Sequence, residues 1–408
     1  MSHIEGEYNM AKMSRINTFN FVGELKFGKD VRATRQLGQS AWSSTRLNVG
    51  VKNGENMQFL NVEYIHSDSV KTTKLLGKDG NMFDVDLSMT TNEDIIKNCA
   101  SFAKIVVDIE TDFEKKKEYT KLIFKKMNHE RKKDEDKTKE DFEKIEEYTK
   151  EINEQANNRY EFVHMKDVVD FLAKNKELLD GKKVRVKGSV KTNYYNGKTN
   201  LQYIPSEIEL VDSEVTDSLM ATVDFFFEKD SIDEDKKERK VFINGYIMDR
   251  IKKKDSLVPL TTVIDYSKID LDNEEHVMLL DFLKGIFSAK DKKQIHKIGI
   301  FVNVINGRVE TEFDPETLTT QQKMSIKLGM NKIEDFMPKD GVYGERVQEL
   351  KVINGDFKNY PEGALEVFPI KELDDYLVET TETIKAQVEE EKKTEDITSE
   401  MKIMNLFG

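Results

Sequence analysis

One short strand pattern occurs twice in this sequence, and it points to a fold built from small β-sheets. Residues 183–190 (KVRVKGSV) and 240–247 (KVFINGYI) share lysine and valine at the start and glycine at the sixth position. In the first copy, valines alternate with lysine and arginine, which is typical of a strand with one buried face. The combination of strand, helix and strand recurs as well. We therefore expect duplicated small β-barrels, although the match is too short to prove duplication.

The N-terminal part of the chain also has a β pattern. Residues 46–52 alternate between apolar and polar side chains, and Asn53-Gly54 follows them as a strong hairpin signal before a strand over 57–65. We expect residues 27–44 to form a flexible loop between the first two strands. A buried strand over 298–305 is expected to end in a second hairpin at Asn306-Gly307.

Two kinds of helix interrupt these strands. Residues 113–158 are rich in lysine and glutamate, contain no proline or glycine, and predict a charged helical hairpin or one long helix. A solvated spacer is the simplest role for such charged helices. Residues 165–179 predict an amphipathic helix, and a further helix is expected around 275–287, before the strand over 298–305.

These patterns predict an α+β chain that is mainly β, with four parts. They are an N-terminal arm (1–13), a first barrel domain (14–213) with a helical insertion at about 89–160, a second barrel domain with a mixed α/β extension (214–370), and a flexible acidic tail (371–408). The tail carries eleven acidic and five basic residues and ends in an apolar tip.

Composition argues against several classes of protein. The chain has 408 residues, a net charge of −13 and one cysteine, Cys99, which excludes an intramolecular disulfide or a thiolate metal cluster. The N-terminus lacks a signal-peptide pattern, and no apolar run approaches membrane-spanning length, so we expect a cytoplasmic protein. The tail alone contributes −6 to the net charge, so the overall sign does not exclude a local basic groove.

Signals for catalysis are weak. The six histidines show no metal-ligand spacing, and neither a phosphate-binding loop nor a nucleophile elbow is present. Asp108 and Glu110 resemble the acidic pairs of nucleases, but such pairs arise by chance among 77 acidic residues. We expect no enzyme activity, no cofactor and no metal.

Binding of single-stranded nucleic acid needs cations for phosphates and exposed aromatic rings on which bases stack. Both occur together in two segments, residues 29–46 and residues 182–203. For residues 182–203 the alternative is an ordinary half-buried strand, and for the single tryptophan, Trp42, the alternative is a position in the core. The candidate residues are Lys29, Arg32, Arg35, Trp42, Arg46, Lys183, Arg185, Lys187, Lys191, Tyr194, Tyr195, Lys198 and Tyr203.

Residues 16–65 and 161–213 resemble the two halves of a bacterial or phage single-stranded DNA-binding protein of the OB-fold type. Asn17, Phe19, Gly23 and Leu25 nearly match the first strand of that family. Val184, Val186, Gly188 and Val190, followed by Tyr194 and Tyr195, match its later strand and aromatic hairpin. The resemblance implies OB-like barrels and covers about a quarter of the chain. The large insertion and the second barrel depart from the family and leave the oligomeric state open.

The resemblance implies sequence-independent binding of single-stranded DNA in replication, recombination or repair. A virus-encoded replication protein would fit the divergence. The alternative is a viral structural or assembly protein that uses its barrels as packing modules, and a nuclease is a third reading. Met404, Leu406 and Phe407 near the chain end resemble a tag for a replication protein or sliding clamp. Docking of this tip on the chain's own domain is the alternative.

Overall fold

The computed structural model describes residues 17–155, 158–195, 197–251, 254–289, 291–310, 318–329, 331–336, 343–356, 366–370 and 373–378. As the sequence predicts, these residues form an α+β structure that is mainly β. A 15-stranded sheet runs through most of it, and β5 and β6 form a separate two-stranded sheet. Within these residues, every helix is too short or too polar to span a membrane.

The first group of strands is arranged around β1. The N-terminal half of β1 lies between β9 and β11, and its C-terminal half pairs with β2. From β2 the pairing continues to β3 and β4, and the Asn61 N–H donates to the Tyr203 carbonyl of β10 (2.7 Å), which leads back through β9 to β1. The strands are β1 (Thr18–Gln36), β2 (Ser43–Asn53), β3 (Asn56–Phe59), β4 (Val62–His66), β9 (Lys183–Tyr195) and β10 (Lys198–Leu210).

The second group forms another ring of pairings. β11 pairs with β13 and β15, β13 with β14, and β15 with β16, while a parallel pairing at Val263 and Lys351 joins β14 to β16. Its elements are β11 (Ser218–Phe227), β12 (Ile232–Asp235), β13 (Lys240–Ile251), β14 (Lys254–Asp265), α6 (Glu274–Ile286), β15 (Gln294–Glu310), α7 (Thr320–Lys327), β16 (Tyr343–Gly355), β17 (Glu366–Pro369) and α8 (Leu373–Tyr376).

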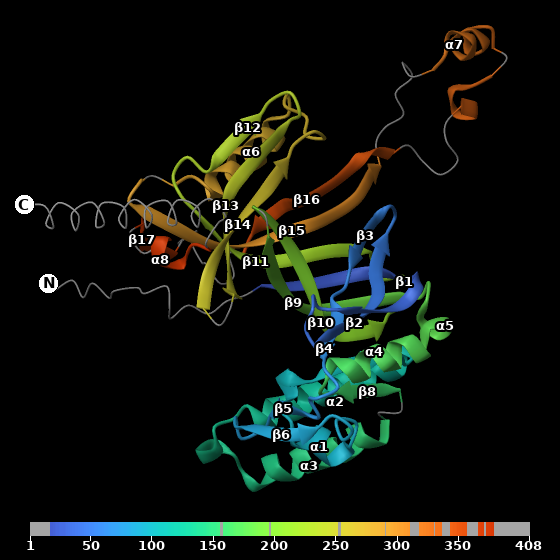
Figure 1. Ribbon diagram of the computed structural model, residues 1–408. Coiled ribbons are helices and arrows are strands. Elements are labelled where there is room, and N and C mark those ends of the chain that lie inside the picture. Colours follow the sequence, from blue (N-terminus) through green and yellow to red (C-terminus); the bar gives the residue numbers. More distant parts are fainter. Residues whose placement is uncertain are drawn as a thin grey trace, which may run out of the picture.

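An inserted region lies between β4 and β9, at the lower end of Figure 1. Two separate helices, α2 and α3, confirm a helical hairpin rather than one long helix. At the bend, the buried Asp141 carboxylate accepts hydrogen bonds from the Thr138 backbone and hydroxyl (both 2.9 Å) and contacts Lys132 (2.6 Å). The elements are β5 (Thr72–Leu76), β6 (Met82–Asp86), α1 (Glu93–Asn98), β7 (Ile105–Asp108), α2 (Phe113–Glu130), α3 (Lys139–Gln155), β8 (Arg159–Phe162), α4 (Met165–Lys174) and α5 (Lys176–Leu179).

The repeated strand pattern does not mark equivalent strands. Its first copy is β9, the fifth strand of the first group in chain order, whereas its second copy begins β13, the third strand of the other group. The shared glycine meets the same packing demand in both. A Cβ on Gly188 would lie 2.0 Å from the Ile204 carbonyl oxygen, and one on Gly245 would lie 2.2 Å from that of Phe226. The shared glycine therefore reflects close backbone contact in both strands, and the repeated pattern is not evidence of duplication.

The two predicted Asn-Gly hairpins have different outcomes. Asn53 and Gly54 do form a turn between β2 and β3, with Gly54 at φ 57°. Asn306-Gly307 does not, because β15 continues through it to Glu310. A Cβ on Gly307 would lie 2.2 Å from the Glu55 carbonyl oxygen, so this glycine permits β3 to approach β15.

Polar contacts hold the two groups of strands together beside the β1–β11 ladder. The Asn17 side chain donates to the Met248 carbonyl (2.9 Å) and accepts from the Asp224 N–H (3.1 Å). The Gln58 amide donates to the Val304 carbonyl (3.0 Å). Buried Asp249 on β13 accepts from Thr192 on β9, through both its backbone N–H (2.6 Å) and its hydroxyl (3.0 Å). The two groups also share one continuous hydrophobic core.

We expect His296 to make the fold less stable in acid. Its ring stacks on Phe227 at 5.6 Å, and neither buried ring nitrogen has a hydrogen-bond partner among the described residues. Burial lowers the pKa of His296 below its usual value of 6.5. The unfolded chain therefore takes up this proton first, so stability is complete above pH 6.5 and falls as the pH decreases through that value.

Urea unfolding across this pH range measures the effect. His296→Leu should flatten the pH dependence of the free energy of unfolding, whereas His276→Leu, at an exposed site on α6, should leave it unchanged. Equal pH dependence in wild type and His296→Leu would contradict the expectation.

Candidate nucleic-acid interface

The first predicted segment forms a long β-ribbon and not a loop. β1 extends to Gln36 and pairs with β2 down to Ser43, so only residues 37–42 turn between them. The prediction of a flexible loop over 27–44 is wrong, because the two strands continue to pair after an irregularity between Phe27 and Arg32. Trp42 lies at the end of this ribbon with 42% of its surface exposed, outside the core.

The cations of this ribbon differ in their partners. Arg32 contacts Asp170 (2.8 Å) and donates to the Tyr64 hydroxyl (2.9 Å), and Arg35 lies 3.8 Å from Glu63. Lys29 and Arg46 are exposed and form no ion pair with any residue that the structure describes. These two cations are the ones best placed to receive phosphates.

All the lysine and arginine side chains of β9 form ion pairs with carboxylates. This strand therefore does not present an uncompensated basic surface. The ion pairs are Lys183–Asp217 (2.8 Å), Arg185–Glu209 (2.9 Å), Lys187–Glu207 (2.9 Å) and Lys191–Asp249 (3.1 Å). The sequence shows the lysine and arginine alternation of β9, but it does not show that the glutamates of β10 lie opposite.

The three predicted tyrosines lie in different environments. Tyr195, at the end of the β9–β10 ribbon, is 70% exposed, and Tyr194 is half-buried against the core. Tyr203 is buried, with its ring 5.4 Å from that of Phe19 and 4.8 Å from that of Phe21, and burial raises its pKa. The structure therefore removes Tyr203 from the set of rings on which a base could stack.

A groove of about 850 Å³ lies where the two groups of strands meet. One wall comes from β3 and the start of β10, and the other from β13, β14, β15 and β16. Phe59 on β3 is 47% exposed within it, and Lys198 lines it from the β9–β10 ribbon. Sequence reasoning missed Phe59, because it alternates with buried residues like any strand residue.

Uncharged polar side chains are the most numerous in the groove lining, and apolar and charged side chains accompany them. Amide and hydroxyl side chains come from both walls, including Gln58, Thr199, Asn200, Asn244, Thr261 and Gln348. Its carboxylates have partners: Glu349 contacts Lys240 (2.6 Å), and Asp230 contacts Lys292 (3.3 Å). Such a surface suits bases or other neutral polar groups better than it suits phosphates.

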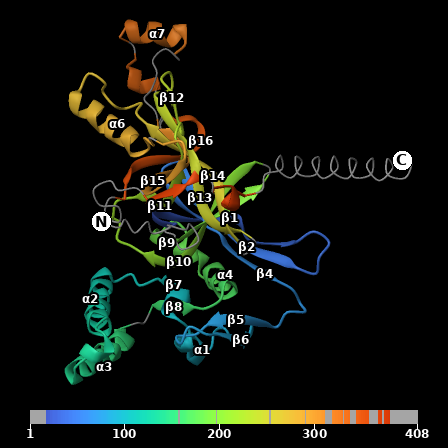
Figure 2. The same ribbon diagram turned by 90° about the vertical axis from the view of Figure 1, so that its left-hand side faces the viewer.

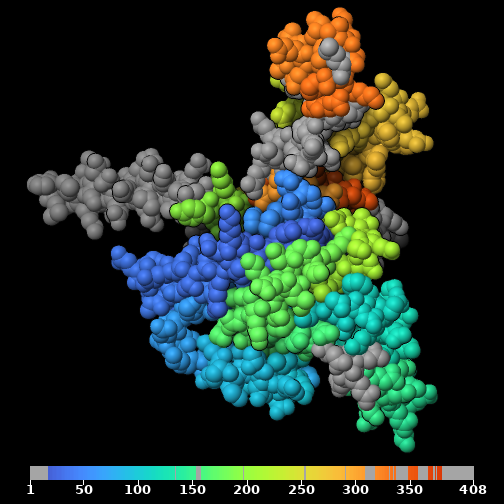
Figure 3. Space-filling view, turned by 90° about the vertical axis from the view of Figure 1, so that its right-hand side faces the viewer, coloured from blue at the N-terminus to red at the C-terminus, as the bar shows by residue number. Residues whose placement is uncertain are grey.

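The groove and the ribbons lie close together. The β9–β10 ribbon supplies residues 197–201 of the groove wall, so Tyr195 lies just beyond the groove's edge. The β1–β2 ribbon projects from the same side of the molecule as the β9–β10 ribbon in Figures 2 and 3. The groove is thus bordered by the β9–β10 ribbon, and the β1–β2 ribbon is a separate projection with its own exposed ring and cations.

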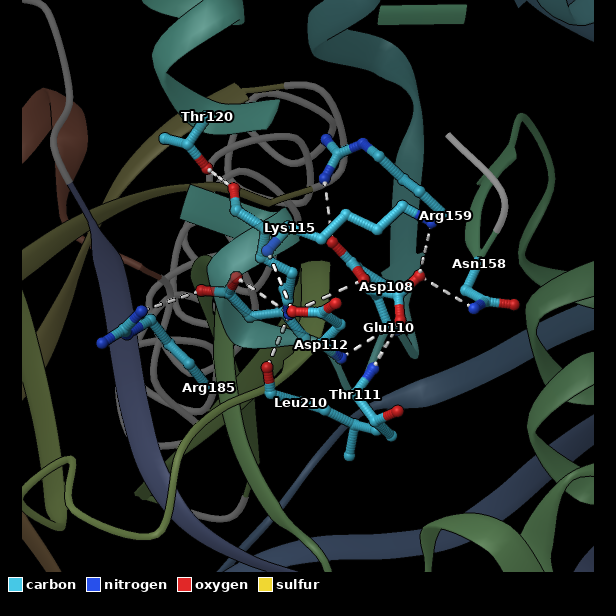
Figure 4. Close-up of polar contacts among 12 residues, drawn as sticks. Asp108, Glu110, Thr111, Asp112, Lys115, Thr120, Asn158, Arg159, Arg185 and Leu210 are labelled. Carbon is cyan, nitrogen blue, oxygen red and sulfur yellow. Dashed lines mark hydrogen bonds and ion pairs between the residues drawn. The ribbon is translucent and has the colours of Figure 1, made fainter. Parts of the chain in front are cut away.

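Asp108 and Glu110 belong to a network of ion pairs at the base of the helical hairpin (Figure 4). Lys116 lies 3.6 Å from Asp108, and Lys115 lies 3.3 Å from Glu110. Hydrogen bonds from the Asp112 backbone N–H and the Asn158 amide lower the pKa of Glu110 to about 2, although burial acts in the opposite direction. Both carboxylates are therefore compensated by neighbouring groups, and Lys116 connects the hairpin to β10 through Glu209 (3.7 Å) and the Leu210 carbonyl (2.6 Å). No cluster of metal-ligand type occurs among the described residues.

The predicted partner-binding residues Met404, Leu406 and Phe407 lie outside the described residues.

No protein-family model and no curated protein matches this sequence. Among solved structures, a deletion mutant of the single-stranded DNA-binding protein from Thermus aquaticus matches over 74% of this chain and 98% of its own, with 6% identity and a TM-score of 0.28. A TM-score this low does not show that the two proteins share a fold.

Proposed function

We propose that this protein is a non-enzymatic, sequence-independent single-stranded DNA-binding protein that acts in replication, recombination or repair. The observation that carries the proposal is the polar groove, which Phe59 and Lys198 line and Tyr195 adjoins, together with the exposed Trp42, Lys29 and Arg46 of the β1–β2 ribbon. Bases would stack on the rings and lie in the groove, and phosphates would contact the cations. The two rings of strands would be OB-like barrels.

The tail completes the proposal on sequence grounds alone. Met404, Leu406 and Phe407 would bind a replication protein or sliding clamp, and the acidic residues before them would keep DNA away from this end.

Titration with oligo-dT, followed by the fluorescence of Trp42, tests the function. Because Trp42 is the single tryptophan and is exposed, bound bases should quench its emission. Tyr195→Ala should weaken binding by about 1–3 kcal/mol without lowering stability, since one exposed stacking ring is lost. Tyr160→Ala, which removes a partly exposed ring from the inserted region, is the matched control. Unchanged affinity in folded Tyr195→Ala would contradict the role of this ring.

A packing module of a viral assembly is the second candidate, and the occupied cations of β9 favour it. Salt dependence separates the two functions. Phosphate contacts release counterions, so affinity for DNA must fall with salt, whereas a packing module has no such DNA affinity to lose.

A further inference from the structure

The outer face of α6 combines exposed apolar side chains with negative charge. Met278 on α6 and Leu271, just before the helix, are 67% and 50% exposed, whereas the other face of α6 buries Leu280, Leu283 and Ile286. Leu271 and Met278 line a shallow depression together with Asp272, Glu274 and Asp281. Exposed apolar side chains that line one depression mark a surface onto which another element packs.

The negative charge around the α6 face determines which kind of protein surface can pack on it. Asp272, Glu274, Glu275 and Asp281 are all exposed, and the one lysine of α6, Lys284, is engaged by Glu234 at 2.9 Å. The α6 face therefore presents carboxylates without neighbouring cations of its own helix. A complementary element would carry apolar side chains flanked by lysine or arginine.

α7 has this composition. Met324 and Leu328 are 52% and 65% exposed, Lys323 and Lys327 lie beside them, and residues 318–329 contain no aspartate or glutamate. Thr319 begins the helix with a capping box, in which its hydroxyl accepts from the Gln322 N–H (3.3 Å). Local sequence thus specifies the helix, yet its apolar side chains remain in solvent.

An isolated helix of eight residues is too short to be stable in water, since marginal stability needs about 12–15 residues. α7 stands clear of the sheets and of α6 in Figure 1. α6 lies before β15 in the chain and α7 lies after it, and the 17 residues of β15 extend on the order of 50 Å. The two helices therefore leave β15 at its opposite ends.

We propose that α7 of one copy of this protein binds the α6 face of a second copy. Met324 and Leu328 would pack on Leu271 and Met278, while Lys323 and Lys327 would contact Glu274 and Asp281. Because the two surfaces differ, the interface is heterologous, and each copy keeps one α6 face and one α7 available for further copies. The result is a head-to-tail array, and it does not depend on the proposed DNA binding.

Sedimentation velocity of the full-length protein without DNA tests this proposal over a concentration series. Wild type should form species larger than a monomer as concentration rises. Lys323→Glu with Lys327→Glu should weaken self-association at least tenfold, and Glu274→Lys with Asp281→Lys should do the same. Lys133→Glu with Lys139→Glu, at exposed sites near the bend between α2 and α3, makes the same charge change and should leave association intact.

Mixing the two charge-reversed proteins should restore association, since the mixture pairs a native α7 with a native α6 face. Circular dichroism confirms that each variant is folded. A wild type that stays monomeric at every concentration would overturn the proposal, as would charge-reversed proteins that associate like wild type. A change in stability without any change in mass would show that α7 binds its own chain, and would overturn it too.

Discussion

Replacing Lys29 and Arg46 with alanine is expected to reduce the salt dependence of oligonucleotide binding while leaving the protein fully stable. These side chains are exposed on the β1–β2 ribbon and have no carboxylate partner among the described residues. If each contacts one phosphate, the slope of log affinity against log salt should become shallower by about 1.4, since one contact to a single strand contributes about 0.7. Anisotropy titrations over a salt series measure this slope.

Arg185→Ala is the informative control, because Arg185 is equally cationic in the sequence but contacts Glu209 at 2.9 Å. Its removal leaves Glu209, 16% exposed at the side chain, with Lys116 as the nearest remaining cation at 3.7 Å. We expect a loss of about 1–2 kcal/mol in the free energy of unfolding and no change in the salt slope. If Arg185→Ala flattened the slope and the ribbon variant did not, β9 would be the phosphate-binding element.

Asp249→Ala is expected to cost about 3 kcal/mol of stability, because hydrogen bonds to a charged group contribute about 1.5–3 kcal/mol each. Asp249 is 5% exposed and accepts hydrogen bonds from Thr192 on the first group of strands and from the Arg250 N–H (2.7 Å). Lys191 lies 3.1 Å away. Alanine would leave the Thr192 donors without their acceptor at the junction between the two groups. Urea unfolding measures the loss.

Two variants sharpen this test. Asp249→Asn keeps the shape and part of the hydrogen bonding, so it should lose less stability than Asp249→Ala. Asp233→Ala, on the exposed strand β12, should lose almost none. Although burial raises the pKa of Asp249, the N–H groups of Thr192 and Arg250 and the Lys191 ammonium together hold it below its usual 3.8. Its contribution should therefore be present above pH 3.8 and disappear as the pH falls further. Equal stability of Asp249→Ala and wild type would show that Asp249 does not join the two groups.

Local patterns in the sequence determined several elements of the secondary structure. Alternating residues predicted β2 and β9, Asn53-Gly54 predicted a real turn, and the apolar spacing of residues 165–179 predicted α4. These predictions hold because the side-chain periodicity of a strand or helix is a property of the segment itself. The helical character of residues 113–158 follows for the same reason, whereas the structure decided between a hairpin and one long helix.

The site depended on tertiary structure. Tyr195 and Tyr203 look alike in sequence, but one is exposed and the other lies between Phe19 and Phe21. Gly54 makes a turn, whereas Gly307 makes room for β3. Arg185 of β9 could be identified as a cation from the sequence, but its ion pair with Glu209 could not be predicted from it. Which side chains face one another across strands is set by pairing between distant segments, and this pairing decides which cations and rings remain available to a ligand.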